Sequence, residues 1–207
     1  LLSGDSGRAL WRSLADLEPD ADGRIRAHGF NTDADALLRS LAEDLDLRVT
    51  AATRVLLLGA GGAARVAALR LAAAGLGALY LINRTPEKAE AIAIEIRSRF
   101  PVCRVETGYP SEPVDLILNG TSLGLKAGDP LPLDTNRFAL RETARVYDMI
   151  YRPAETPLLR LAREAGRRVS NGLGMLLYQG ARALEIWSGR PAPIATMRET
   201  LCSNVYG

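Results

Sequence analysis

Short apolar runs alternate with helical patterns along most of the chain. Residues 55–58 are apolar throughout and are followed by glycines, which predicts a fully buried central strand. Residues 62–74 are rich in alanine and leucine and stop at Gly75 and Gly77, so we predict a helix there. Residues 78–82 form the next apolar run. A strand, a helix and a strand in this order are typical of a parallel sheet.

The alternation continues to the end of the chain. Pro86 suits the first turn of a helix that we expect to reach Phe100. Further strands are predicted at residues 114–118, 146–150 and 168–170, and further helices at 156–165, at 173–187 and after Pro193. The segment between residues 118 and 146 holds too many glycines and prolines for regular structure. The predicted fold class is α/β: a doubly wound (Rossmann-like) parallel sheet with helices on both faces.

Composition narrows the class of protein. Of the 207 residues, 47% are hydrophobic and 24% charged, as in globular proteins with a sizeable core. The 26 basic and 24 acidic residues nearly cancel and form no long block, so we expect no nucleic-acid partner. No apolar run reaches the roughly 18–20 residues that cross a bilayer, and no signal peptide is evident, so we expect no membrane partner and a cytoplasmic location. Two cysteines, Cys103 and Cys202, are too few for a metal cluster, so we predict free thiols and no metal.

A glycine motif lies directly after the first strand. Residues 59–64, Gly-Ala-Gly-Gly-Ala-Ala, fit G-x-G-x-x-A between an apolar strand and a helix. Gly59 permits the tight turn, Gly61 lets a pyrophosphate approach the backbone, and the small Ala64 lets the helix pack closely on the sheet. The helix N-terminus offers free N–H groups to the phosphates. A glycine-rich turn without a ligand is the alternative interpretation.

The end of the second strand indicates which dinucleotide binds. An acidic residue there would accept a hydrogen bond from the ribose 2′-hydroxyl of NAD. This chain has Asn83, Arg84 and Thr85 instead, and a guanidinium pairs well with a 2′-phosphate. The sequence therefore favours NADP over NAD, unless Arg84 simply points into solvent.

Several separated motifs resemble the shikimate dehydrogenase family, which includes the quinate dehydrogenases. From about residue 22 to the end they are Asp22-Gly23-Arg24, Asn31-Thr32-Asp33, residues 59–64, Asn83-Arg84-Thr85, Asn119-Gly120-Thr121-Ser122-Leu123-Gly124, Asp148-Met149-Ile150-Tyr151 with Thr156-Pro157, and Gly172-Leu173-Gly174-Met175 with Gln179. The resemblance concerns mainly the C-terminal NADP-binding domain. It implies an NADP-dependent oxidoreductase of aromatic amino acid (chorismate) biosynthesis that interconverts 3-dehydroshikimate and shikimate by hydride transfer, with quinate as a variation on the substrate.

The resemblance also implies a cofactor site. Its residues would be Gly59, Ala60, Gly61, Gly62, Ala63, Asn83, Arg84, Thr85, Asn119, Thr121, Ser122, Leu123, Met149, Gly172 and Met175. The loop that begins at Asn119 would lie along the nicotinamide end, and Met149 and Gly172 would hold the nicotinamide ring. Without the resemblance, a structural Asn-Gly turn and a core methionine are the plainer interpretations.

Asp33, Tyr151 and Gln179 are the substrate residues that the resemblance implies. Asp33 would be catalytic, binding a substrate hydroxyl beside a lysine, while Tyr151 and Gln179 would donate hydrogen bonds to hydroxyl or carboxylate groups. The plainer alternatives are a helix cap near residues 31–33, a surface tyrosine and an exposed glutamine. His28, the single histidine, is interpreted as structural.

The first 30 residues depart from the family. A helix at residues 7–17, a turn at 20–23 and a strand at 24–30 are the elements expected there. Family members place a substrate domain with a catalytic lysine before the Asn-Thr-Asp stretch, whereas this chain begins with leucine and has only Lys88 and Lys126. We interpret residues 1–30 as a remnant of, or a junction to, that domain, and residues 31–207 as one NADP-binding domain that includes the C-terminal helices.

The missing lysine limits the expected activity. Ketone reduction needs a proton donor, and such groups contribute about 10²–10⁴-fold. Lys126 is the one local substitute, and a solvated loop lysine is the preferred interpretation of it. We expect this chain alone to bind NADP with little turnover of shikimate or 3-dehydroshikimate. The alternatives are a non-catalytic NADP- or ligand-sensing module and one part of a multifunctional polypeptide. Docking to an N-terminal domain, or a homodimer, would cover the apolar surface expected at the junction.

Overall fold

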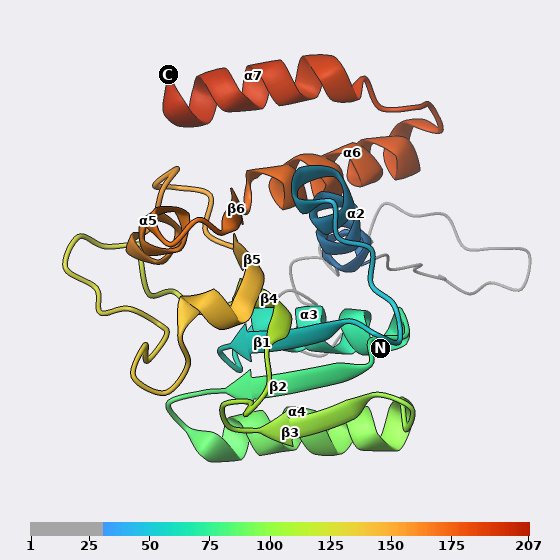
Figure 1. Cartoon of the computed structure of the whole chain (residues 1–207). Coiled ribbons are helices and arrows are strands. Elements are labelled where there is room, and N and C mark those ends of the chain that lie inside the picture. The colour runs from blue at the N-terminus through green and yellow to red at the C-terminus, as the bar shows by residue number, and fades with distance from the viewer. Residues whose placement is uncertain (1–30) are drawn as a thin grey trace, which may run out of the picture. The chain divides into compact units, whose positions relative to one another are not determined.

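The computed structural model describes residues 31–207. The elements expected at residues 7–17, 20–23 and 24–30, and His28, lie outside the described residues. Six parallel strands form one sheet (Figure 1). They are β1 (Arg54–Leu58), β2 (Ala78–Ile82), β3 (Arg104–Thr107), β4 (Val114–Asn119), β5 (Thr143–Asp148) and β6 (Arg168–Asn171). The helices are α2 (Thr32–Leu45), α3 (Gly62–Ala73), α4 (Pro86–Arg99), α5 (Pro157–Glu164), α6 (Leu173–Ser188) and α7 (Ile194–Tyr206), with a short 3₁₀ helix, η2 (Leu140–Glu142).

The strand order confirms the predicted doubly wound, Rossmann-like α/β fold. The strands lie in the order β3-β2-β1-β4-β5-β6, so the chain runs outward from β1 in one direction and then outward from β4 in the other. In such sheets, ligands bind beyond the carboxyl ends of the strands where this reversal occurs. Here the reversal lies between β1 and β4, which directs attention to the turns that follow those two strands.

The two faces of the sheet are covered differently. Leu57 and its same-face neighbours pack against α2, α3 and α4. Leu56 and the opposite face pack against α5 and apolar side chains of the long segment before β5, among them Phe138. Because β1 is buried on both faces, its sequence is apolar throughout rather than alternating.

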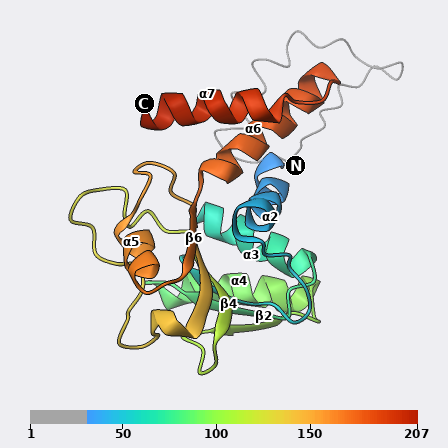
Figure 2. The same cartoon turned by 45° about the horizontal axis from the view of Figure 1, so that its top comes forward.

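Helices α6 and α7 form a further layer over α2 (Figures 1 and 2). Ala36 of α2 packs with Leu177 and Tyr178 of α6, and Met197 and Leu201 of α7 pack against this small cluster. None of the α7 residues is buried. Across residues 31–207, no helix has the length and apolar character needed to cross a membrane.

Three details differ from the sequence prediction. Strand β3 was not predicted, because it has four residues of which only Val105 is buried. Strand β5 begins at Thr143 and ends at Asp148, whereas residues 146–150 were expected. It ends early because the Asp148 side chain accepts the N–H of Ile150 at 3.0 Å and turns the chain out of the sheet. The segment expected to be irregular contains the 3₁₀ helix η2.

Candidate functional site

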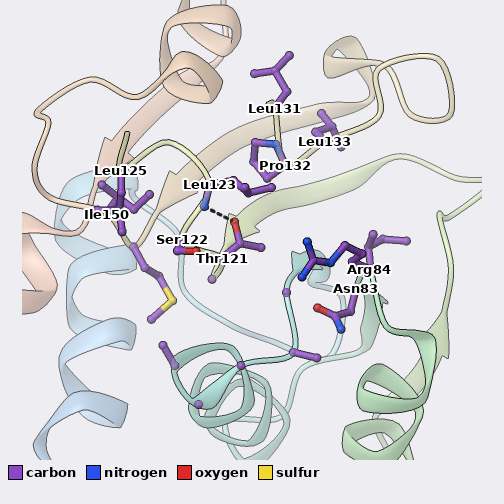
Figure 3. A pocket seen from close by; sticks show the side chains of 18 of the residues that line it. Asn83, Arg84, Thr121, Ser122, Leu123, Leu125, Leu131, Pro132, Leu133 and Ile150 are labelled. Atoms are coloured by element: carbon purple, nitrogen blue, oxygen red, sulfur yellow. Dashed lines mark hydrogen bonds between the residues drawn. The ribbon is translucent and has the colours of Figure 1, made fainter. Parts of the chain in front are cut away.

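A cleft of about 1330 Å³ opens at the carboxyl ends of β1, β2, β4 and β5. Figure 3 shows its walls: the glycine-rich turn after β1, the segment after β2, the loop after β4 and the residues after β5. Most of the residues that the sequence analysis assigned to a binding site line this cleft. Those that line the cleft are Gly59, Ala60, Gly61, Gly62, Ala63, Asn83, Arg84, Thr85, Thr121, Ser122, Leu123, Met149 and Tyr151.

The glycine-rich turn has the geometry that its sequence predicts. Gly59 has a φ of +106°, which side chains other than glycine rarely adopt, and a Cβ there would lie 2.9 Å from Thr121 Cγ2. Gly61 is the N-cap residue of α3 and makes no side-chain capping hydrogen bond, and a Cβ on Gly61 would meet no protein atom within 4 Å. The backbone at Gly61 is therefore open to a ligand, and the first N–H groups of α3 are available to an anion.

Close packing fixes this turn against the loop after β4. Ala64, the small residue of the motif, is fully buried. A Cβ built on Gly120 would lie 2.9 Å from the Ala64 Cβ, so neither position has room for a larger side chain. The turn after β1 and the loop after β4 consequently form one rigid floor for the cleft.

The segment after β2 presents a guanidinium and no carboxylate. Asn83 donates from Nδ2 to the carbonyl of Thr85 at 2.8 Å, which holds the segment in a compact bend. The Arg84 guanidinium points into the cleft in Figure 3, between the glycine-rich turn and the wall at Leu133. Arg84 is exposed and, among the described residues, its side chain has neither an ion pair nor a hydrogen bond.

Positive charge predominates around the cleft. Arg84, Lys88, Arg137 and Arg152 line it, whereas Asp134 is the single acidic residue that the described part of the chain places there. Most arginines of residues 31–207 form an ion pair or donate to a carbonyl, but the side chains of Arg84, Arg137 and Arg152 do neither. Such a lining favours an anionic ligand.

The loop after β4 is held by Asn119, which is fully buried and does not line the cleft. Its Oδ1 accepts the N–H of Thr121 at 3.0 Å and the Thr121 hydroxyl at 2.7 Å. Its Nδ2 donates to the Leu123 carbonyl at 3.3 Å. The Thr121 hydroxyl oxygen also accepts the Leu123 N–H at 3.1 Å (Figure 3). Asn119 therefore shapes the wall that Thr121 and Leu123 present.

Asp148 connects the loop after β4 to the segment after β5, and sequence reasoning gave it no role of its own. Its carboxylate is fully buried and accepts hydrogen bonds from Asn119 Nδ2 at 3.0 Å, Ile150 N at 3.0 Å and Thr156 Oγ1 at 2.7 Å. The Thr156 oxygen in turn accepts the Leu159 N–H and caps α5. Burial raises the pKa of the Asp148 carboxyl above its usual range, while the three hydrogen bonds oppose that rise.

The remaining expected cofactor residues lie around the segment after β5. Met149 lines the cleft, and its N–H donates to the Asn119 carbonyl at 3.0 Å. Gly172 lies behind this segment, where its N–H donates to the Ile150 carbonyl at 3.1 Å. Met175 does not line the cleft and packs partly buried between the core and the α6–α7 cluster.

The expected substrate residues are separated. Tyr151 lines the cleft and is 40% exposed, and its carbonyl accepts the Tyr206 hydroxyl at 2.7 Å. Asp33 lies exposed in the first turn of α2, and Gln179 lies half-buried on α6; neither lines the cleft. Lys126 is also exposed and outside the cleft, whereas Lys88 lines it on the β2 side.

The residues present fit a dinucleotide with an extra phosphate. The open backbone at Gly61 leaves room for a pyrophosphate, and the unpaired guanidinium of Arg84 stands where NAD-specific folds carry a carboxylate.

Two family descriptions match the sequence: "Shikimate / quinate 5-dehydrogenase" over residues 40–109 and "Shikimate 5'-dehydrogenase C-terminal domain" over residues 172–202. The chain belongs to the shikimate/quinate dehydrogenase family.

Individual relatives show how far the similarity extends. The shikimate dehydrogenase (NADP(+)) of Moorella thermoacetica is 46% identical over 184 residues, which are 84% of this chain and 60% of that protein. A crystal structure of a shikimate dehydrogenase in complex with NADP+ is 33% identical, with a TM-score of 0.75, over 86% of this chain and 63% of that one. The ligand-free 5-ketofructose reductase of a Gluconobacter species is 36% identical, with a TM-score of 0.73, over 86% and 64%. This chain thus spans about 60% of the length of the curated relative that it matches.

Proposed function

We propose that this chain binds NADP(H) in the cleft and serves an oxidoreductase reaction of the shikimate dehydrogenase type, interconverting 3-dehydroshikimate and shikimate. One observation carries the proposal: among the described residues, the guanidinium after β2 has no protein partner, and it lies in the same cleft as the glycine-rich helix start after β1, next to the reversal point of the sheet. Family membership supports the same cofactor, since the relatives at 33–46% identity include NADP-dependent shikimate dehydrogenases.

Each part of the cleft has a distinct task in this proposal. The N–H groups at the start of α3 bind the pyrophosphate, and Arg84 pairs with the 2′-phosphate. The loop at Thr121–Leu123 and the Met149 side chain border the nicotinamide. NADP(H) supplies the hydride that passes between its nicotinamide and a ring carbon of the substrate. Tyr151, which lines the cleft, orients the substrate. Asp33 and Gln179 lie outside the cleft, so this proposal assigns them no contact in it.

Binding titrations test the cofactor part of the proposal. We expect the full chain to prefer NADPH to NADH, and Arg84→Asp to weaken NADPH binding by about a hundredfold, because it replaces a charge-assisted pair with repulsion. Arg48→Asp is the matched control, since the Arg48 side chain also has no partner among residues 31–207 and does not line the cleft. Equal affinities for the two cofactors before and after Arg84→Asp would refute the proposal.

A turnover assay tests the reaction. We expect the 207 residues alone to reduce NADP+ with shikimate slowly or not at all, because neither Lys88 nor Lys126 lies on the β5 side of the cleft. Rapid turnover would contradict this and make Lys126→Ala the next variant. The assay includes 5-ketofructose with NADPH, since a reductase of that compound has a similar structure. Turnover of 5-ketofructose without turnover of shikimate would reject the proposed substrate.

A further inference from the structure

A second guanidinium lies in the cleft, on a segment that the sequence motifs do not include. Arg137 lines the cleft, and the central carbon of its guanidinium lies 4.8 Å from the centroid of the Tyr109 ring. Among the described residues, the Arg137 side chain forms no ion pair and no hydrogen bond. Contact with the ring therefore orients this cation while its N–H groups stay unused.

Strand register places Tyr109 alongside the segment that holds Arg84. Leu81 of β2 pairs with Thr107 of β3, and the N–H of Gly108 donates to the Leu81 carbonyl at 3.0 Å. Two parallel chains in this register bring Tyr109, which follows Gly108, alongside the residues that follow β2. Tyr109 and Arg84 accordingly line the same cleft.

The Arg137 backbone is also fixed. The Tyr109 hydroxyl accepts the N–H of Asp134 at 2.9 Å, and the Asp134 carbonyl accepts the N–H of Arg137 at 3.1 Å. This turn ties the segment before η2 to Tyr109, two residues after the end of β3, although Asp134 lies 25 residues further along the chain. Arg137 is thus held at the cleft at both its backbone and its side chain.

Phosphate chemistry gives a use for two guanidiniums at this place. A phosphate monoester carries close to two negative charges and three terminal oxygens, and one guanidinium fork engages two of them. A second guanidinium, stacked by its face on an aromatic ring, can present its edge to the remaining oxygen.

We propose that Arg137 is a second binding residue for the 2′-phosphate of the cofactor, facing Arg84, and that Tyr109 is the positioning residue that holds it there. This assignment rests on the proposed NADP(H) function. It predicts that selectivity for the phosphorylated ribose depends on two segments of the chain, the one after β2 and the one before η2.

Two nucleotides isolate the adenosine end of the site. Adenosine 2′,5′-bisphosphate and adenosine 5′-monophosphate differ only in the 2′-phosphate, and neither carries a nicotinamide. We expect Arg137→Ala in the full chain to weaken the bisphosphate about tenfold, as loss of one charge-assisted hydrogen bond does, and the monophosphate less than about twofold. Arg190→Ala is the control, because the Arg190 side chain forms no ion pair within the described part of the chain and lies outside the cleft, so the change should alter neither affinity.

The Tyr109 variants separate positioning from general structure. Tyr109→Phe and Tyr109→Leu both lose the hydroxyl that accepts the Asp134 N–H, but only the phenylalanine keeps the ring. We expect Tyr109→Leu to lower the ratio of bisphosphate to monophosphate affinity about threefold relative to Tyr109→Phe. Equal ratios for the two variants would overturn the positioning role.

The outcomes distinguish this inference from the proposed function. If the unaltered chain prefers the bisphosphate and Arg137→Ala behaves like Arg190→Ala, the Arg137 assignment is wrong and NADP(H) binding stands. If Arg137→Ala weakens both nucleotides equally, Arg137 contacts the adenine or the 5′-phosphate, and the assignment is again wrong. If the unaltered chain shows no preference for the bisphosphate, both proposals fail.

Discussion

The two halves of the sheet build their sides of the cleft in opposite ways. On the β1–β2 side, the wall consists of backbone at Gly61 and of the exposed side chain of Arg84, which has no protein partner among residues 31–207. On the β4–β5 side, the wall rests on the buried Asn119 and Asp148 side chains, whose hydrogen bonds are made within the protein. The first half offers groups to a ligand, and the second half holds its own loops in place.

Because of this difference, substitutions on the two sides should affect different properties, ligand affinity on one side and folding stability on the other. A group whose partner is a ligand can be changed with little effect on folding, whereas a buried polar group leaves its partners unsatisfied when it is removed. We therefore expect changes to the two β1–β2 positions that face the cleft, Gly61 and Arg84, to lower affinity with the fold intact. Changes on the β4–β5 side should lower stability first.

Asp148→Ala should produce the largest loss of stability. It leaves three buried donors, on Asn119, Ile150 and Thr156, without their acceptor, and we expect a loss of about 3 kcal/mol in the free energy of unfolding. Urea unfolding followed by circular dichroism measures this loss. Asp129→Ala is the control, because the half-buried loop carboxylate of Asp129 also accepts two backbone N–H groups, from Gly124 and Lys126. Similar losses for both variants would show that burial of the acceptor does not set the cost of removing it.

Two alanine substitutions in one turn sharpen the comparison. Gly59→Ala meets both a positive φ and the nearby Thr121 methyl group, so we expect it to destabilise the fold by about 1–2 kcal/mol. Gly61→Ala places its methyl group in open space, so its stability cost should stay below about 1 kcal/mol while NADPH affinity falls about tenfold or more. Thermal unfolding and NADPH titration of both variants measure the two effects. A larger stability loss for Gly61→Ala than for Gly59→Ala would show that the open backbone has a folding role.

The β1–β2 side could be predicted because its signals are local. The strand at residues 55–58, the glycine turn and Arg84 lie within 30 residues of one another, and each carries its own sequence pattern. The apolar runs likewise predicted five of the six strands, since strands buried on both faces cannot alternate. Strand β3 was not predicted because only one of its four residues is buried, so its sequence contains no apolar run.

The β4–β5 side depends on contacts between distant residues. The family resemblance assigned Asn119 to the cofactor site, but no sequence pattern pairs its buried amide with Asp148, 29 residues away, to which it donates a hydrogen bond. The Tyr109–Arg137 contact likewise joins residues with no shared motif. Single-sequence patterns report which residues are apolar or form turns, and they contain no information on which polar groups meet across strands.

The smallest expected effect is a pH dependence of stability that comes from the buried Asp148 carboxyl group. It tests whether burial or the hydrogen bonds of Asp148 determine its protonation in the folded state. Because burial raises the pKa of Asp148 in the folded state, the unfolded chain releases this proton at a lower pH than the folded chain does. The Asp148 contribution to stability is therefore full below the unfolded carboxyl pKa of about 3.9, and it is lost as the pH rises through the folded pKa. Asp148→Asn removes this contribution, so the free energy of unfolding of the unaltered chain minus that of Asp148→Asn should fall as the pH rises above about 4. The lowered pKa of Glu43 gives an opposite slope that is common to both proteins and cancels in the difference. A difference that instead rises with pH would mean that the hydrogen bonds from Asn119, Ile150 and Thr156 outweigh desolvation and that Asp148 is stabilised as a carboxylate.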